Sequence, residues 1–336
     1  MDLGLLCTGG GMRFAELVDF AREAETAGAA AFYMAEVWRS GFVPLTAVAS
    51  ATSRMRLGTY VLNAYGRSPL VTGLSAIDFN EYCGGRLVLG VGGGNRLINE
   101  QWQGIPHARV LTKMAEYVTL LQRMARTRLG ERIDFEGKVH RMHWEPAIDP
   151  GPTPFSIYLA AVFPDMLKVA ARVADGIACG ATLSAPYLRE VIRPLVDLAA
   201  RTAGRDPATL RWNSVAFIAV DEDRERARRA ARVALCHLYA PLPHPYYEFT
   251  MREQGFTTTV DALLKLAPAG ALEAAADSIP DEVIDRLVIA GTPAECFARI
   301  KDYEGVVDEL LLLNAMGGDV QTSHTPLLAL IRDYMK

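Results

Sequence analysis

The sequence predicts an α/β protein in which eight parallel strands close into a (β/α)8 barrel. Short apolar runs of strand length alternate with longer runs in which apolar residues recur at helical spacing. The short runs are almost continuously apolar, as in parallel strands buried on both faces. Eight such runs follow one another along 336 residues. This order favours one barrel domain over residues 1–336, with insertions, rather than an open doubly wound sheet.

The expected strands are rich in aliphatic and β-branched residues, and the fourth ends in three consecutive glycines. We expect strands at residues 3–7, 31–36, 55–63, 85–94, 156–162, 176–180, 213–220 and 308–314. Gly28 marks the end of the first helix and Pro69 the start of the third. We expect helices at residues 13–28, 44–53, 69–82, 113–128, 165–174, 185–203, 222–238, 292–303 and 326–335.

Two insertions interrupt the alternation. Residues 132–154 are rich in Pro, His and Gly, which predicts a hairpin or a loop. Residues 240–285 begin with an aromatic and proline-rich stretch and continue with short helical patterns. We interpret this second insertion either as a lid over a site or as a packing or dimer element.

Composition limits the functional class. A net charge of −4 and a pI near 5.9 argue against nucleic acid binding. The arginines at 224–232 lie among acidic residues, which predicts the solvated face of a helix. No apolar run is long enough to span a membrane, and a cytoplasmic location is expected. Five cysteines without a CxxC pair are expected to be reduced core thiols: Cys7, Cys83, Cys179, Cys236 and Cys296.

The glycines that end the fourth strand have no side chains and so leave the backbone accessible. A ligand or another chain segment can approach it there. The glycines do not form a dinucleotide fingerprint, because Asn95 stands where the third glycine should be. A metal site is not expected either. His140 and His143 lie three residues apart on an extended segment and so point to opposite faces, with no cysteine or carboxylate cluster beside them.

The candidate site lies at the carboxyl ends of the strands, where barrel enzymes build their active sites. Glu36 and Trp38 follow the second strand, and Asn63, Tyr65 and Arg67 follow the third. Glycine and alanine at the ends of the fourth to sixth strands leave room for a broad, flat ligand. Such a ligand is more typical of a cofactor than of a small metabolite.

Three stretches resemble the bacterial-luciferase-like superfamily. Residues 58–69 carry an Asn-x-Tyr-x-Arg-x-Pro run, residues 84–94 are similar to the fourth strand of that superfamily, and residues 160–176 are similar to its fifth strand and following loop. The closest branch is typified by methylenetetrahydromethanopterin reductase, which uses the deazaflavin coenzyme F420. The resemblance covers the whole chain and implies a luciferase-like TIM barrel that binds F420, with FMN as the alternative cofactor.

The resemblance also implies roles for individual residues. Tyr60 and Val61 would form a bulge, often with a cis peptide bond, that backs the deazaflavin ring. Glu36 and Asn63 would hydrogen-bond the ring or the ribityl chain. Backbone N–H groups at a helix N-terminus would bind the cofactor phosphate, and they belong to Val162, Phe163, Asp165 and Met166. The remaining cofactor-binding residues would be Gly93, Gly94, Asn95, Ala161, Gly180 and Ala181.

Three residues depart from the related sugar-phosphate dehydrogenases. The resemblance gives those enzymes a histidine, an acid and a lysine where this chain has Val37, Asn95 and Leu183. A sugar phosphate is therefore a poor fit. We expect hydride transfer between the deazaflavin C5 and a C=C, C=N or similar electrophilic carbon of a small apolar or heteroaromatic substrate. Trp38, Tyr65 and the aromatic insertion would form the walls.

Glu36 is the best candidate for a catalytic acid, since a carboxyl at a desolvated strand end can have a raised pKa. The alternative, which we favour, is that Glu36 only accepts a hydrogen bond from the cofactor. Tyr65 and Glu100 are weaker candidates for the acid.

Two rival functions stay open. One is an FMN-dependent monooxygenase on the same barrel, and the other is a superfamily member that has lost its cofactor and its activity. By analogy with the superfamily we also expect a homodimer, formed through helices around the second to fourth strands.

Overall fold

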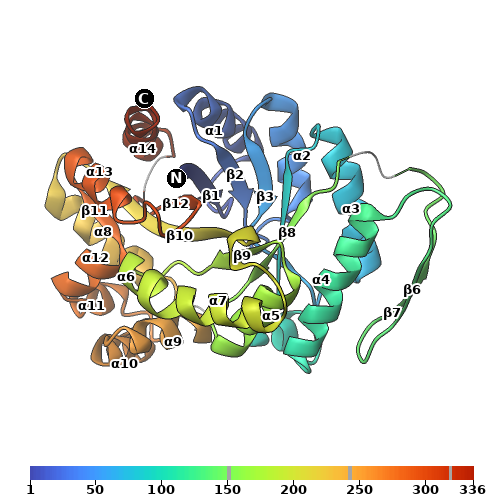
Figure 1. The fold of residues 1–336 in the computed structure, drawn as a ribbon. Coiled ribbons are helices and arrows are strands. Elements are labelled where there is room, and N and C mark those ends of the chain that lie inside the picture. The colour runs from blue at the N-terminus through green and yellow to red at the C-terminus, as the bar shows by residue number, and fades with distance from the viewer. Residues whose placement is uncertain (150–152, 241–243, 318–319) are drawn as a thin grey trace.

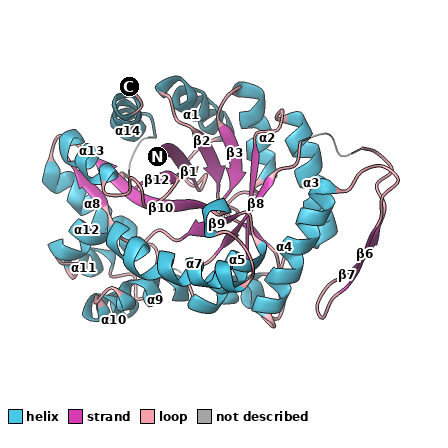
Figure 2. Ribbon diagram, viewed as in Figure 1, coloured by secondary structure: helices cyan, strands magenta, loops and turns pink. Residues whose placement is uncertain are grey.

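A computed structural model describes residues 1–149, 153–240, 244–317 and 320–336. Within these residues eight parallel strands close into a barrel that helices surround (Figure 1, Figure 2). The strands of the closed ring are β1 (Asp2–Cys7), β2 (Ala31–Met34), β3 (Arg56–Thr59), β5 (Leu87–Gly92), β8 (Ser156–Ala160), β9 (Gly176–Cys179), β10 (Arg211–Val220) and β12 (Glu309–Asn314). Each pairs with the next, and β12 returns to β1. The predicted fold class is confirmed.

Helices cover the outside of the barrel because one side of each is apolar. In α1 the buried side includes Leu17, Phe20 and Ala24, and the helix ends at Gly28 with a φ of 96°. The covering helices are α1 (Phe14–Ala27), α2 (Phe42–Ala51), α3 (Pro69–Tyr82), α4 (Val110–Arg126), α5 (Pro164–Val173), α6 (Ala185–Tyr187), α7 (Arg193–Thr202), α8 (Arg224–Cys236), α13 (Pro293–Lys301) and α14 (Val320–Tyr334).

Several boundaries differ from the prediction. The third strand is interrupted after Thr59, and the short strand β4 (Leu62–Asn63) continues it against β5. The strand β11 (Ile289–Gly291) was not predicted, because three residues are too few for a periodic signal, and it pairs outside the ring with β10. The last helix begins at Val320, and Pro326 lies inside it. The helix expected at 185–203 contains a π-helical turn, η2 (Leu188–Ile192).

Both predicted insertions are structured. The first forms the hairpin β6 (Ile133–Glu136) and β7 (Arg141–Trp144), which packs apolar residues against α4, while residues 150–152 lie outside the described part of the chain. The second forms α9 (Pro245–Glu253), α10 (Thr257–Leu266), α11 (Leu272–Asp277) and α12 (Asp281–Leu287), and its residues 241–243 are likewise not described. The described helices include none that is long and apolar enough to cross a membrane. All five cysteines are free and buried, as predicted.

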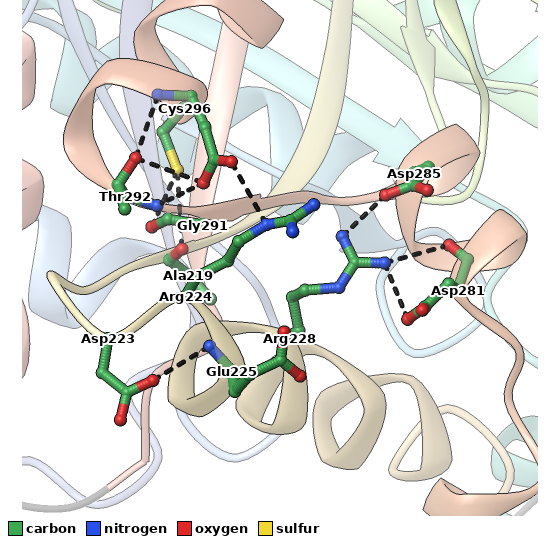
Figure 3. Close-up of polar contacts among 11 residues, drawn as sticks. Ala219, Asp223, Arg224, Glu225, Arg228, Asp281, Asp285, Gly291, Thr292 and Cys296 are labelled. Carbon is green, nitrogen blue, oxygen red and sulfur yellow. Dashed lines mark hydrogen bonds and ion pairs between the residues drawn. The ribbon is translucent and has the colours of Figure 1, made fainter.

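Arginines of α8 anchor the second insertion. Arg228 is only 4% exposed, and its guanidinium donates to the carboxylates of Asp281 at 2.8 Å and Asp285 at 2.6 Å, as Figure 3 shows. Arg229 binds Glu273 and Asp277 of α11, and Arg232 also binds Asp281 of α12. The prediction of a solvated helix face is therefore wrong for Arg228. The acidic partners are remote in sequence, so spacing within α8 could not reveal them.

A polar cluster lies at the amino ends of the barrel strands. The buried carboxylate of Glu309 on β12 accepts a hydrogen bond from the Tyr33 hydroxyl at 2.8 Å and forms an ion pair with Arg56 at 2.5 Å. Arg56 also binds Asp2 on β1 at 2.7 Å. The cluster therefore links β1, β2, β3 and β12 and neutralises a carboxylate that would be costly to bury alone.

Arg56→Met should lower the free energy of unfolding by about 3 kcal/mol, because Glu309 would keep a buried charge without its partner. This loss lies at the low end of the range for breaking a buried ion pair, because Arg56 is itself partly exposed and solvent already screens its charge. Urea denaturation measures the change. The matched control is Arg22→Met, which removes the exposed ion pair with Asp19 and should cost less than about 1 kcal/mol. Equal losses in both variants would contradict the assignment.

Candidate active site

Glu36 follows β2 and is held by the protein around it. Its carboxylate forms an ion pair with Arg67 at 2.8 Å and accepts a hydrogen bond from the backbone N–H of Asn63 at 3.2 Å. This pairing raises the pKa of Arg67. A pocket of about 540 Å³ adjoins the pair and is also lined by Val71 and Trp102. The Glu36 carboxylate therefore serves as a hydrogen-bond acceptor within the protein.

The segment between β3 and β4 contains the features that the resemblance implied. The peptide bond between Tyr60 and Val61 is cis. The phenol of Tyr60 crosses the barrel and donates to the carbonyl oxygen of Cys179 at 2.5 Å. Burial raises the pKa of Tyr60 well above its usual value, so the phenol stays protonated.

The glycines of β5 admit another chain segment. A Cβ atom on Gly90 would lie 2.1 Å from the Thr59 carbonyl oxygen, and one on Gly92 would lie 2.7 Å from the Val61 side chain. Gly94 has a φ of 65°, and a Cβ there would lie 2.7 Å from the amide of Asn63. Of the two explanations for the bare backbone, contact with the protein accounts for these glycines.

Asn63 and Tyr65 are tied into this contact. The Asn63 side chain accepts from the Tyr65 backbone N–H at 2.9 Å and donates to Asn99 at 2.6 Å. The Tyr65 hydroxyl donates to the Ala108 carbonyl oxygen at 2.7 Å, and its ring stacks on His107 with centroids 4.8 Å apart. The hydroxyl of Tyr65 is therefore already used in a hydrogen bond to the backbone.

Other predicted residues lie close by in the same loop. Asn95 is buried, and its side chain accepts from the Leu97 backbone N–H at 2.9 Å. Gly93 packs against Val110, where a Cβ would lie 3.1 Å from the side chain. Glu100 forms an exposed ion pair with Arg96 at 3.0 Å. A carboxylate paired with a guanidinium is a poor proton donor, which argues against Glu100 as the acid.

The predicted phosphate loop lies at the start of α5. Phe163 is the N-cap and its side chain makes no capping bond, while Pro164 occupies the first helical position. Among the contacts of the described residues, the backbone N–H groups of Asp165 and Met166 have no partner. Two such donors at the positive end of a ten-residue helix suit a phosphate group.

The loops after β8 and β9 lie side by side there. Ala161 donates its backbone N–H to the Ala178 carbonyl oxygen at 3.2 Å. A Cβ on Gly180 would lie 3.1 Å from the Val162 side chain, and Ala181 is buried. The structure therefore brings Ala161, Val162 and Gly180 together.

Helix α9 joins the two groups of predicted residues. The Tyr246 hydroxyl donates to the Gly94 carbonyl oxygen, and its ring lies 5.6 Å from the ring of Phe163. Phe249 packs on Phe163 as well, at 4.8 Å. Thr250 bonds Thr182 after β9 at 2.6 Å. The second insertion thus bridges the carboxyl ends of β5, β8 and β9, which is the position expected of a lid.

Sequence reasoning missed Asn99, His107 and the individual lid residues. Asn99 lies in a π-helical turn, η1 (Ile98–Trp102), and this turn gives no periodic signal. The prolines and aromatic residues that begin the second insertion left a lid and a packing or dimer element equally open, and they did not indicate which strand ends it would touch. The described residues contain no group of three or more His, Cys, Asp or Glu side chains placed to hold a metal.

Comparisons with known proteins found a matching family and relatives that align with most of the chain. The family model for luciferase-like monooxygenases matches residues 1–309. A 5,10-methylenetetrahydromethanopterin reductase of Archaeoglobus fulgidus is 30% identical over 317 residues, which cover 93% of each chain. An F420-dependent glucose-6-phosphate dehydrogenase of Kineococcus radiotolerans is 27% identical and covers 90% of this chain and 88% of its own.

The solved structure of a coenzyme F420-dependent tetrahydromethanopterin reductase from Methanopyrus kandleri superposes with a TM-score of 0.83. The alignment covers 99% of this chain and 97% of that one, at 19% identity. This likeness shows that the two chains share a fold.

Acid should weaken the attachment of the lid through His244. Burial beside Tyr246 and Tyr247 lowers the pKa of His244 to about 4, below the value of about 6.5 in an unfolded chain. Between these values the unfolded chain binds more protons, so stability falls as the pH drops. The free energy of unfolding should therefore fall between pH 7.5 and pH 5.5 by about 1 kcal/mol less in His244→Phe than in the wild type. Urea denaturation at the two pH values measures this difference.

The control for this prediction is His143→Gln. The carboxylates of Asp134 and Glu136 raise the pKa of His143, so its contribution is present at low pH and is lost as the pH rises. Its removal should therefore shift the pH dependence in the opposite direction. If the free energy of unfolding changes between pH 5.5 and 7.5 by the same amount in His244→Phe as in the wild type, the burial of a neutral imidazole is contradicted.

Proposed function

The chain belongs to the luciferase-like monooxygenase family, and from this premise we propose that it is a coenzyme F420-dependent oxidoreductase acting as a reductase. The observation that carries the proposal is the uncapped N-terminus of α5, which lies beside the lid and the strand ends that the family resemblance assigns to the cofactor. F420-dependent enzymes among the relatives support the choice of F420 over FMN.

The residues present fit such a coenzyme. The N–H groups of Asp165 and Met166 would bind its phosphate, and the cis segment at Tyr60 and Val61 would back its ring. When bound, the reduced coenzyme supplies a hydride from its ring carbon C5. The protein binds and orients the reactants, and the lid residues exclude water from them.

We assign Glu36 as a hydrogen-bond acceptor for the coenzyme rather than as an acid. Its carboxylate already accepts hydrogen bonds from Arg67 and from the Asn63 backbone N–H. For Tyr65 we propose a positioning role, because its hydroxyl is engaged with Ala108 and its ring lies between His107 and the ammonium of Lys113. The substrate walls are then supplied by the aromatic rings of the lid.

The substrate class follows from those walls. Phe163, Tyr246 and Phe249 form an aromatic cluster at the carboxyl end of β8. Leu183 is buried, and its backbone oxygen accepts from Tyr303 at 3.2 Å, so no cation stands there for a sugar phosphate. We therefore propose a small apolar or heteroaromatic acceptor with a C=C or C=N bond.

Titration of the purified protein followed by fluorescence tests the coenzyme. We expect F420 to bind at micromolar concentration, FMN to bind negligibly, and the deazaflavin nucleoside without the phosphate to bind at least about tenfold more weakly than F420. Preferred binding of FMN would support the monooxygenase instead. Absence of binding by either coenzyme would support a non-catalytic family member.

We also propose a cytoplasmic homodimer formed through α2 and α3. Four apolar side chains are exposed on these helices, namely Val43, Val71, Leu74 and Tyr82, each between 42% and 63% exposed. The two helices are joined by a hydrogen bond of 2.6 Å between Ser50 and Tyr82. Exposed apolar side chains gathered on neighbouring helices are typical of an interface between subunits.

Val71→Glu should convert the dimer to a monomer, because a carboxylate would be buried at the interface without a partner. Light scattering coupled to size-exclusion chromatography measures the mass. Leu198→Glu is the control, since Leu198 is 66% exposed on α7, outside the proposed interface. A wild-type protein that is monomeric, or a Leu198→Glu variant that dissociates equally, would overturn the proposal.

A further inference from the structure

Asn99 is fully buried, and its side chain uses its whole hydrogen-bonding capacity. Its Oδ1 accepts from Asn63 at 2.6 Å and from Gln103 at 3.4 Å. Its Nδ2 donates to the Gly93 carbonyl oxygen and to Nδ1 of His107, both at 2.8 Å. An amide offers two donors and two principal acceptor sites, so Asn99 has none left over.

Backbone groups at both ends determine the direction of these bonds. The Tyr65 N–H can only donate, so Oδ1 of Asn63 accepts and its Nδ2 donates to Asn99. The Gly93 carbonyl can only accept, so Nδ2 of Asn99 must point towards it. Nδ1 of His107 then faces a donor and must accept, and a neutral imidazole carries its proton on Nε2.

The surroundings of His107 keep it neutral. Its ring stacks on Tyr65, and burial lowers its pKa. The guanidinium of Arg96 acts in the same direction, while the carboxylate of Glu100 opposes both. Protonation would place an N–H of His107 against the N–H of Asn99, so the chain of bonds also disfavours the cation.

We propose that Asn99 is a positioning residue of the active site, which holds Asn63 at the end of β4 and the glycine rim after β5 in one fixed arrangement. The proposal rests on the proposed function, because these two strand ends are the ones assigned to the coenzyme ring. Asn99 joins them through its side chain, and its backbone carbonyl also binds the Ile105 N–H of the loop above at 2.8 Å.

The lid depends on the same arrangement. Tyr246 of α9 donates to the carbonyl of Gly94, the neighbour of the glycine that Asn99 holds. A shift of this rim would therefore move both the coenzyme contact and the point where the lid attaches. Misplacement of such groups by a fraction of an ångström is enough to weaken binding and catalysis.

Asn99→Asp tests the proposal in the full-length protein. The variant keeps the acceptor for Asn63 but replaces the donor to Gly93 and His107 with a carboxylate oxygen. We expect the Kd for F420 to rise about tenfold, as a buried carbonyl loses its donor. We also expect the proton of His107 to move to Nδ1, where it can bind the carboxylate. Nitrogen-15 NMR of histidine-labelled protein at pH 8 reads this position without any coenzyme, with His107→Phe to assign the signal.

Asn80→Asp is the matched control. Asn80 is also buried, and it bonds the Thr153 carbonyl at 2.8 Å and the Leu87 N–H at 3.3 Å, at the opposite end of β5. The substitution makes the same chemical change in α3, beside the amino end of β5 and far from the carboxyl ends of the strands. It should lower the melting temperature to a similar extent but leave the Kd for F420 and the His107 signal unchanged.

The outcomes separate the two proposals. If the wild-type protein binds neither F420 nor FMN, the proposed function is contradicted. The positioning role of Asn99 then fails with it, because there is no coenzyme to position. Wild-type binding with an unchanged Kd in a folded Asn99→Asp protein overturns the positioning role alone. A wild-type His107 with its proton on Nδ1 overturns the bond directions. If Asn99→Asp does not fold, Asn99→Ser removes the amide without adding charge, and the same Kd criterion applies.

Discussion

Closure of the parallel sheet is the constraint on which the rest of the structure depends. The long strand β10 makes this closure, because its first residues pair with β9, its middle with β12 and its last residues with β11. A closed ring leaves no strand of the barrel unpaired and directs all eight carboxyl ends to one side. Residues far apart in the sequence, such as Glu36 and Gly180, therefore belong to the same face.

Close approach between the third and fourth barrel strands then shapes this face. Gly90, Gly92 and Gly94 let β5 lie against the cis segment and the amide of Asn63. The amide network continues through Asn99 to His107, so the rim is built from backbone and amide groups of defined direction. The opposite side of the opening is different, because α5 presents unpaired N–H groups there. One side of the site is suited to a ring and the other to an anion.

The second insertion connects these two sides. Helix α9 contacts Gly94 on one and Phe163 on the other, while Arg228 of α8 holds the base of the insertion through Asp281 and Asp285. The insertion is therefore held by ion pairs at α12 and by polar and aromatic contacts at α9. The neutral His244 at the start of α9 adds a dependence on pH to that attachment.

The sequence by itself determined the order of strands and helices, the class of barrel and the segments that carry the site. These depend on apolar periodicity, and on glycines and prolines that act within a few residues of themselves. Only the tertiary structure decided that the glycines of β5 admit another chain segment, that Arg228 is buried, and that Asn99 connects two strand ends. Each of these facts depends on a partner remote in sequence, or on a carbonyl whose direction is set by the folded chain. Local patterns contain no information about such partners. The sequence could therefore name candidate residues such as Asn63 and Tyr65, but it could not predict which groups they hydrogen-bond.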